Sequence, residues 1–223
     1  MENLHDELND YKNINHQAYK NNANDSDHRQ TGLDWFNSQM LRLVPQKYNP
    51  ESERNEQIGD WDKVGGSRHV GVYQNKKTGE IHQAISGSRT LKDFFADGMM
   101  MLGYKNAHYN KRKEEAVEMA LRIQRLKNAS GQHLKHSISG HSLGSNISNE
   151  LIHKGMGDKG VNFNPFVTRH DAHKADHHKI LNVRNKGDFA SYRTRNFSNT
   201  VNLDGPNNKI YDVRNHSLGK IKI

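Results

Sequence analysis

Residues 140–144 form the pentapeptide Gly-His-Ser-Leu-Gly, which follows a short apolar run and precedes a run with helical periodicity. In a G-x-S-x-G sequence the small residues let the chain turn sharply from a strand into a helix. Such a turn lifts the serine hydroxyl above the sheet and aims the next backbone N–H at a developing oxyanion. The pentapeptide also arises by chance, so its surroundings decide its meaning. With a strand before it and a helix after it, the pattern predicts that Ser142 is the nucleophile of a hydrolase.

The length and polarity of the chain indicate one domain with a polar extension. A chain of 223 residues fits one domain of ordinary size. Only 32% of the residues are hydrophobic and the mean hydropathy is −1.03, so we expect part of the chain to lie outside the core. We expect residues 1–31 to form a polar, flexible segment and residues 32–223 to form a single domain. Within the N-terminal segment, four apolar residues at helical spacing allow a weak helix: Leu4, Leu8, Tyr11 and Ile14.

Several classes of protein are disfavoured by the sequence. No apolar stretch approaches the ~20 residues that span a bilayer. The first residues are polar and acidic, so we expect neither a signal peptide nor a transmembrane segment. The compartment stays open, and an intracellular or particle-associated protein is compatible with the sequence. The chain has no cysteine, which excludes disulfides, thiol catalysis and thiolate metal ligands.

The formal net charge of +8 favours anionic partners such as a phospholipid surface or nucleic acid. Acidic residues are interleaved with the basic ones and no recognition motif accompanies them, so we expect no specific nucleic-acid binding. The chain has fifteen histidines, and its densest set comprises His170, His173, His177 and His178. Because neither an H-E-x-x-H pattern nor a cysteine accompanies this set, we expect a solvated loop without a metal.

Apolar periodicity divides the centre of the chain into strands and helices. The turn-rich residues 75–79 separate two apolar strands, near 70–72 and at 81–85, which is typical of a β-hairpin. Apolar stripes predict helices at 91–101, 111–126 and 143–154. Strands are predicted at 134–139, 161–166, 180–183 and 210–213, and a first core segment, helical or extended, at 32–44. A hairpin followed by alternating strands and helices indicates an α/β sheet.

A serine nucleophile needs a base, and the base needs an acid that orients it. In α/β-hydrolases the acid and then the histidine follow the serine along the chain. Asp188 lies just past the strand predicted at 180–183, where open α/β sheets carry functional groups, and His216 follows the strand predicted at 210–213. Three other carboxylates downstream of the serine have no strand directly before them: Asp171, Asp176 and Asp204.

Together these features resemble the class 3 lipase family of α/β-hydrolases over about residues 68–218. The resemblance is carried by the serine elbow, by the Asn-x-x-Asp sequence at 185–188 and by His216-Ser217-Leu218. Upstream, Ile85-Ser86-Gly87-Ser88 resembles the oxyanion strand of the family, and residues 93–97 resemble the Asp-aromatic-x-x-Asp sequence that follows it. The resemblance implies an α/β-hydrolase-like fold with a mostly parallel sheet flanked by helices. The short stretch between the serine and the histidine implies a trimmed sheet.

The resemblance also implies a role for each matching residue. Ser142 would attack an acyl carbonyl, and His216 would take up the serine proton and return it to the leaving group. Asp188 would fix the imidazole tautomer and stabilise the imidazolium. The backbone N–H groups of Leu143 and Ser88, with the Ser88 hydroxyl, would form the oxyanion hole.

The chain departs from the family pattern in two places. Ser86 stands where the family usually has arginine, and Phe189 and Ala190 follow the acid in place of a proline-containing turn.

The sequence predicts a serine ester hydrolase of the lipase or phospholipase type. It would form an acyl-enzyme from a lipid or ester substrate, at a surface that its charge suggests is anionic, without a metal or organic cofactor. Two alternatives stay open: a catalytically weak or inactive lipase-like structural or binding module, and a basic nucleic-acid-binding protein. Peptidase or thioesterase chemistry and the oligomeric state also stay open.

Overall fold

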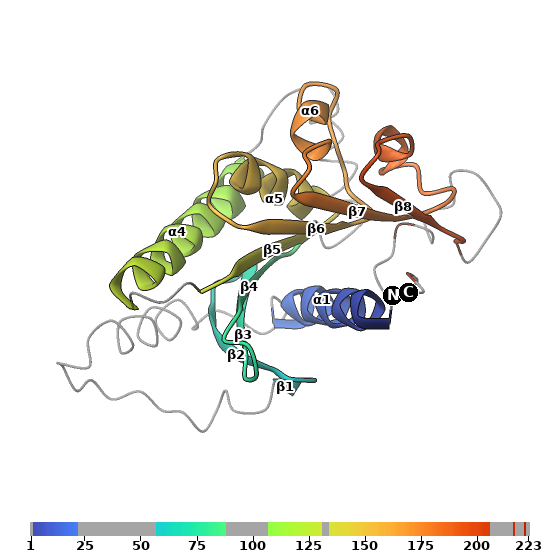
Figure 1. Ribbon diagram of the computed structural model, residues 1–223. Helices are drawn as coiled ribbons and strands as arrows, with labels where there is room; N and C mark the ends of the chain where they lie inside the picture. Colours follow the sequence, from blue (N-terminus) through green and yellow to red (C-terminus); the bar gives the residue numbers. More distant parts are fainter. Residues whose placement is uncertain are drawn as a thin grey trace.

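The computed structural model describes residues 2–21, 57–87, 107–130 and 134–205, together with His216 and Ile221. Its centre is a mixed sheet of eight strands whose order across the sheet is their order along the chain (Figure 1). The strands are β1 Gln57–Ile58, β2 Trp61–Gly66, β3 Val70–Asn75, β4 Ile81–Ile85, β5 His136–His141, β6 Lys159–Phe163, β7 Ile180–Asn185 and β8 Thr200–Leu203. Helices flank the sheet, which confirms the α/β fold predicted from the alternating pattern.

The two halves of the sheet differ in strand direction. β1 to β4 are antiparallel neighbours, whereas β4 to β8 are parallel. The predicted hairpin is β3–β4, and in its turn Asn75 Oδ1 accepts hydrogen bonds from the N–H groups of Lys77 (2.9 Å) and Thr78 (3.0 Å). In the parallel half the carboxyl ends of the strands meet at one edge, which is where α/β proteins carry their functional groups.

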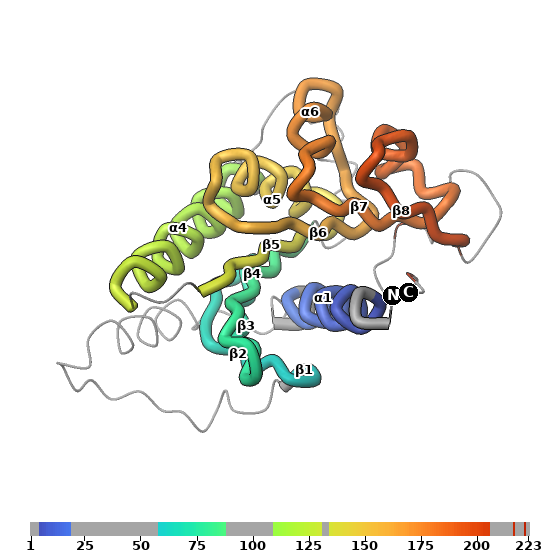
Figure 2. Tube along the Cα trace, in the orientation of Figure 1, coloured from blue at the N-terminus to red at the C-terminus, as the bar shows by residue number. Residues whose placement is uncertain are grey.

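Helices form a layer on each face of the sheet (Figures 1 and 2). One layer contains α4 Ala107–Ser130, α5 Leu143–His153 and the short α6 Ala172–Ala175, with the 3-10 helix Tyr192–Thr194 beside α6. The other layer is α1 Glu2–Asn21. The apolar core is divided in the same way. One cluster, which includes Ile123, Ile138 and Ile147, lies under α4 and α5, and another, which includes Ile14 and Phe163, lies under α1.

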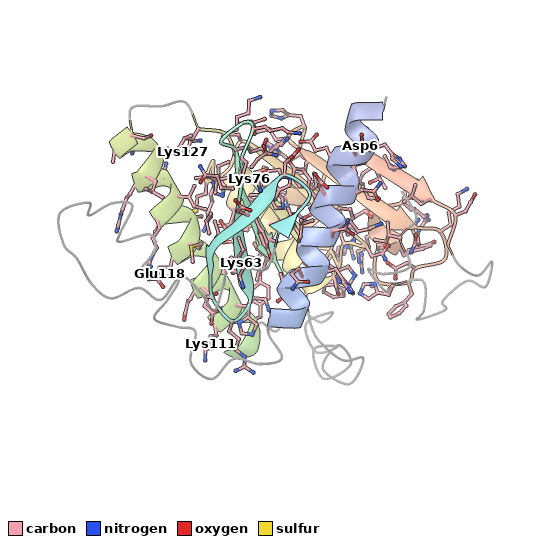
Figure 3. All side chains as sticks on the ribbon, turned by 90° about the horizontal axis from the view of Figure 1, so that it is seen from below. Asp6, Lys63, Lys76, Lys111, Glu118 and Lys127 are labelled. Carbon is pink, nitrogen blue, oxygen red and sulfur yellow. The ribbon has the colours of Figure 1, made fainter. Side chains whose placement is uncertain are left out.

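The two long helices of the first layer differ in burial. α4 buries one stripe, which includes Ala116, Ala120 and Ile123, and exposes charged residues such as Lys111 and Glu118, both labelled in Figure 3. By contrast, every residue of α5 from 143 to 152 is buried, because the helix lies between the sheet and its neighbouring helices. A helix enclosed on all sides gives the residue at its N-terminus a fixed position.

The N-terminal residues depart from the flexible segment expected at 1–31. Residues 2–21 form α1, whose apolar stripe is buried against the sheet. The ring of Tyr11 stacks on that of His82 with centroids 4.1 Å apart, and its hydroxyl donates to Glu80 Oε1 at 2.8 Å. The polar composition of these residues led to the expectation of a flexible segment, but a helix needs only one apolar face to pack against a core. Residues 22–31 lie outside the described part of the chain.

Polar side chains tie α1 to the middle of the sheet. His82 on β4 has its Nδ1 2.8 Å from Ser137 Oγ and its Nε2 2.6 Å from Ser139 Oγ, both on β5. Ser139 also accepts a hydrogen bond from Asn15 of α1. Burial, together with the charge of nearby Lys159, holds the pKa of His82 well below its usual value. The imidazole is therefore neutral and acts as a hydrogen-bonding member of the interior.

Most of the predicted elements are present with boundaries shifted by a few residues. The helices predicted at 111–126 and 143–154 are α4 and α5, and the strands at 134–139, 161–166 and 180–183 are β5, β6 and β7. The sheet begins before the predicted hairpin, with β1 and β2, and the half-exposed β8 was not predicted. The segments 32–44, 91–101 and 210–213 lie outside the described residues. None of the described helices combines the length and hydropathy of a membrane span.

Candidate active site

The predicted elbow is a sharp turn between β5 and α5. Ser142 has φ 54° and ψ −122°, a conformation that costs a non-glycine residue free energy. The flanking glycines are required by close packing. A Cβ on Gly140 would lie 2.5 Å from the backbone of Gly144, and a Cβ on Gly144 would lie 2.4 Å from the carbonyl oxygen of Ile85. The G-x-S-x-G spacing is therefore dictated by backbone contacts with β4 and within the turn itself.

Backbone hydrogen bonds hold the turn on both sides. The Ser142 N–H donates to the carbonyl of Phe163 at the end of β6, and the Ser142 carbonyl accepts from Ser145 and Phe166, each at 3.1 Å. Leu143 is the first residue of α5, so its N–H has no acceptor within the helix. The positive end of the helix dipole lies at the same point. This is the position at which the sequence predicted one oxyanion donor.

The structure brings Ser142, His216 and Asp188 together although they are far apart in the sequence. The Nε2 of His216 lies 2.7 Å from Ser142 Oγ, and its Nδ1 lies 3.0 Å from Asp188 Oδ1. Because a carboxylate only accepts hydrogen bonds, Nδ1 carries the proton and Nε2 is the acceptor for the serine hydroxyl. The side chain of His216 is 13% exposed and that of Asp188 is fully buried. The arrangement couples a hydroxyl to a buried negative charge through one imidazole.

Each oxygen of the Asp188 carboxylate accepts two hydrogen bonds. Oδ1 accepts from the N–H of Ala190 at 3.1 Å as well as from His216. Oδ2 accepts from the N–H and the hydroxyl of Ser191, at 3.3 Å and 2.5 Å. Burial raises the pKa of Asp188, but the charge of His216 and these hydrogen bonds outweigh burial and lower the pKa overall. The group is therefore an ionised carboxylate held in one orientation.

The loop that carries Asp188 is fixed from beneath by a buried guanidinium. Arg184, near the end of β7, donates to the Asp188 carbonyl at 3.1 Å, to Ser191 Oγ at 3.0 Å and to Asn202 on β8 at 2.8 Å. These three contacts join β7, the acid loop and β8. Arg184 thus holds the main chain of Asp188 while leaving its carboxylate to face His216.

A second strained residue supports the same loop. Asn164 follows β6 with φ 41°, and its Oδ1 accepts from the N–H of Asn185 at 2.8 Å. Asn185 in turn begins the Asn-x-x-Asp turn, in which its carbonyl accepts from the N–H of Asp188 at 3.2 Å and Gly187 takes φ 81°. The turn that aims Asp188 is therefore connected to the ends of two strands.

His141, the residue before Ser142, contacts the other side of His216. Its Nε2 donates to the carbonyl oxygen of His216 at 2.9 Å, and the two rings lie 5.2 Å apart. Burial, with the charge of His216, lowers the pKa of His141 to about 3, so its ring is neutral. Sequence reasoning assigned no role to His141, Arg184, Ser191 or Asn164. Of these four residues, only His141 could have been suspected from the sequence, because it lies inside the pentapeptide directly before Ser142.

The segment predicted as the oxyanion strand is described only in part. β4 is the parallel neighbour of β5, with Ile85 opposite Gly140, so Ser86 and Gly87 follow β4 next to the elbow. Ser86 is buried, and both its N–H and its hydroxyl donate to the carbonyl of His69. Ser88, the second predicted donor, lies outside the described residues.

The other predicted acids are occupied elsewhere or remote. Asp171 accepts from Thr168 at 2.8 Å and from Lys174 at 2.8 Å, and its pKa falls to about 2, because these donors and charges outweigh burial. Asp204 pairs with Lys186 on the surface, and Asp176 is exposed. None of these three carboxylates contacts His216 within the described chain.

Part of the histidine-rich set gathers at the end of α5. The rings of His173 and His177 lie 5.8 Å and 5.9 Å from that of His153, and His177 lies 4.3 Å from His178. Over residues 2–21, 57–87, 107–130 and 134–205, no three potential ligands are arranged to hold a metal ion.

Comparison with solved structures finds a lipase with a similar fold. The chain is similar to the Lip2 lipase from Yarrowia lipolytica, with a TM-score of 0.50 and 11% sequence identity, over 80% of this chain and 80% of that chain. At this identity the likeness shows the fold alone, so the chain has a lipase-like α/β fold. No protein-family model matches the sequence, and no curated protein matches it.

Proposed function

We propose that this protein is a serine ester hydrolase of the lipase or phospholipase type, related to the class 3 lipases, that works through an acyl-enzyme. The observation that carries the proposal is the continuous hydrogen-bonded chain from Ser142 through His216 to Asp188, which starts at a strained strand-to-helix turn. A buried polar residue in a purely structural turn would not need this strain or this partner set. The lipase-like fold is consistent with the proposal.

The first half of the reaction forms the acyl-enzyme. Ser142 Oγ attacks the carbonyl carbon of the ester while its proton passes to His216 Nε2. The carbonyl oxygen becomes an oxyanion, which the N–H of Leu143 and the α5 dipole stabilise. Asp188 stabilises the imidazolium without taking its proton. When the tetrahedral intermediate collapses, the C–O bond breaks and His216 gives its proton to the leaving alkoxide.

The second half returns the enzyme to its starting state. His216 Nε2 takes a proton from water, and the resulting hydroxide attacks the acyl-Ser142 carbonyl. Collapse of the second intermediate releases the carboxylic acid, and the proton returns to Ser142 Oγ. Water is the only co-reactant, so the proposal assigns no metal or organic cofactor. The net charge of +8 favours esters presented at an anionic lipid surface.

A matched pair of serine variants tests the proposal. Ser145 is buried one turn further along α5, and its Oγ has no hydrogen-bond partner in the described part of the chain, so Ser145→Ala removes an equivalent hydroxyl. For a nitrophenyl butyrate substrate, we expect Ser142→Ala to lower kcat by about 10⁴-fold or more and Ser145→Ala to change it little. Equal activities for the two folded variants would contradict the assignment of the nucleophile. A folded wild type with no turnover would favour a lipase-like module without catalysis.

A further inference from the structure

A cavity of about 510 Å³ lies beside the proposed triad. It is formed by two loops, residues 166–172 after β6 and residues 189–197 after β7. Both loops follow the carboxyl ends of parallel strands, on the edge of the sheet where β5 ends just before Ser142. Its volume is in the range of cavities that bind small molecules.

Two residues connect the cavity directly to the triad. Phe189, which lines the cavity, follows Asp188, and its ring lies 6.1 Å from that of His216. Phe166, also in the lining, donates its N–H to the Ser142 carbonyl. The cavity therefore begins on the His216 side of the proposed nucleophile. In serine hydrolysis the histidine protonates the leaving alcohol, so this side receives the alcohol part of an ester.

The lining combines an apolar wall with cationic side chains. Phe166, Val167, Phe189 and Ala190 supply apolar surface next to the triad. The charged residues of the lining are all arginines: Arg169, Arg193 and Arg195. Arg169 and Arg193 are exposed, and the guanidinium of Arg195 lies 3.5 Å from the centroid of the Tyr192 ring. The cavity can therefore cover an apolar group and, at its rim, an anion.

The nearby carboxylates do not neutralise these arginines. Asp171 pairs with Lys174 at 2.8 Å, Asp188 with His216 at 3.0 Å and Asp204 with Lys186 at 2.9 Å. Among the described residues, no carboxylate lies within salt-bridge distance of the three arginines of the lining. Arg184 is buried behind the same loop, where its guanidinium interacts with the charge of Asp188. Guanidinium groups bind phosphate oxygens through paired, charge-assisted hydrogen bonds.

From this juxtaposition we propose that the cavity binds the phosphate-bearing alcohol of an acyl ester, with the phosphate at Arg169, Arg193 and Arg195. The inference rests on the proposed ester hydrolysis and adds a substrate class to it. A monoacyl glycerol phosphate has this chemistry: its alcohol leaves toward His216, and its phosphate is only a few bonds from the ester oxygen. The reaction itself is unchanged, with water hydrolysing the acyl-enzyme and the glycerol phosphate leaving first.

A matched pair of substrates tests the substrate class. Lauroyl glycerol phosphate and monolauroylglycerol share the acyl chain and the ester and differ in the phosphate. With both kept below micelle formation, we expect the wild type to show a kcat/KM at least about tenfold higher for the phosphate ester. Arg193→Gln and Arg169→Gln should each lower that preference several-fold and leave kcat/KM for monolauroylglycerol nearly unchanged, since neither side chain contacts the reacting atoms.

A charge control separates local binding from general attraction. Arg125 is exposed on α4, away from the cavity lining, so Arg125→Gln removes the same charge and should keep the wild-type preference. If the wild type hydrolyses monolauroylglycerol without preferring the phosphate ester, or if Arg125→Gln matches the two cavity variants, the substrate class is wrong and ester hydrolysis stands. If the wild type hydrolyses neither ester nor nitrophenyl butyrate, the proposed function fails and the substrate class falls with it.

Discussion

The carbonyl oxygen of His216 accepts a hydrogen bond of 2.9 Å from Nε2 of His141, the residue directly before Ser142. The serine elbow therefore holds His216 at two points: Ser142 contacts the ring and His141 contacts the main chain. Because burial and the charge of His216 lower the pKa of His141 to about 3, this ring stays neutral near neutral pH. One pentapeptide thus supplies the proposed nucleophile and a residue that positions its base.

The first prediction concerns this contact. His141→Leu keeps a buried apolar side chain but removes the donor, so His216 loses one of its anchors. We expect kcat for nitrophenyl butyrate to fall about 10- to 100-fold while KM changes little, because a small displacement of the imidazole affects the reacting geometry more than binding. His141→Gln, which can still donate, should recover part of the loss. Steady-state kinetics of the three proteins decide the matter, and an unchanged kcat in His141→Leu would show that the contact is incidental.

The second prediction concerns the tight approach of the elbow to β4. In Gly144→Ala the new Cβ would lie 2.4 Å from the Ile85 carbonyl, which is backbone and cannot move aside easily. We expect a loss of about 3 kcal/mol or more in the free energy of unfolding. Gly155→Ala is the control: it has open space but φ +72°, so it should cost only about 1–2 kcal/mol and keep full activity. Urea unfolding measures both, and equal costs would contradict the packing argument.

The third prediction distinguishes the two buried carboxylates near the carboxyl edge of the sheet. Asp188→Asn removes the charge that faces His216 Nδ1 and favours the wrong tautomer, so kcat should fall by about 10⁴-fold. Asp171→Asn removes a carboxylate whose side-chain hydrogen bonds among the described residues are with Thr168, Lys174 and Asn146. It should cost stability but keep kcat within about threefold of the wild type. The reverse outcome would assign the acid to Asp171.

The fourth prediction is that acid destabilises the protein before its carboxylates titrate. Burial, mainly, lowers the pKa of His136 to about 4 and that of His141 to about 3, and it lowers the pKa of His82 well below 6.5. Below pH 6.5 the unfolded chain binds protons at these positions and the folded chain does not, so stability falls as the pH falls. Each histidine should cost on the order of 2 kcal/mol between pH 7 and pH 5.

A single variant tests whether the buried histidines cause the loss of stability in acid. His136 has an Nε2 without a hydrogen-bond partner in the described part of the chain, so His136→Gln disturbs few contacts. The variant should flatten the dependence of the unfolding free energy on pH by about one third, because it removes one of the three buried histidines named above. Urea unfolding at pH 7 and pH 5 gives the slope. A slope equal to that of the wild type would trace the acid sensitivity to other groups.

The sequence predicted the parallel half of the fold well because β5, α5, β6 and β7 each carry a clear apolar pattern. It missed β8, whose residues are half exposed and lack alternation, and it underestimated α1. In α1 the apolar stripe is the only feature of the sequence that indicates burial. The structure adds hydrogen bonds from the Tyr11 hydroxyl and the Asn15 amide to polar side chains of the sheet. Buried polar residues add nothing to the apolar periodicity of a helix, so from the sequence they are expected to be exposed to solvent.

The residues of the proposed triad could be predicted from their order along the sequence, but the residues that hold the triad in place could not. Ser142 has a motif, and Asp188 follows a readable strand. By contrast, Arg184 acts through contacts with Asn202 and Ser191, and Asn164 through a strained backbone that only the folded chain defines. Such contacts depend on how neighbouring strands are paired, which a single sequence does not state.

The most direct test of the central claim is covalent labelling of Ser142. A fluorophosphonate reacts with a serine only when a neighbouring base activates it. Intact-mass measurement of the folded wild type should show one phosphonyl group, peptide mapping should locate it at Ser142, and labelling should be lost in Ser142→Ala and kept in Ser145→Ala. A folded wild type that stays unlabelled, or a Ser142→Ala protein labelled like the wild type, would contradict the assignment of Ser142 as an activated nucleophile.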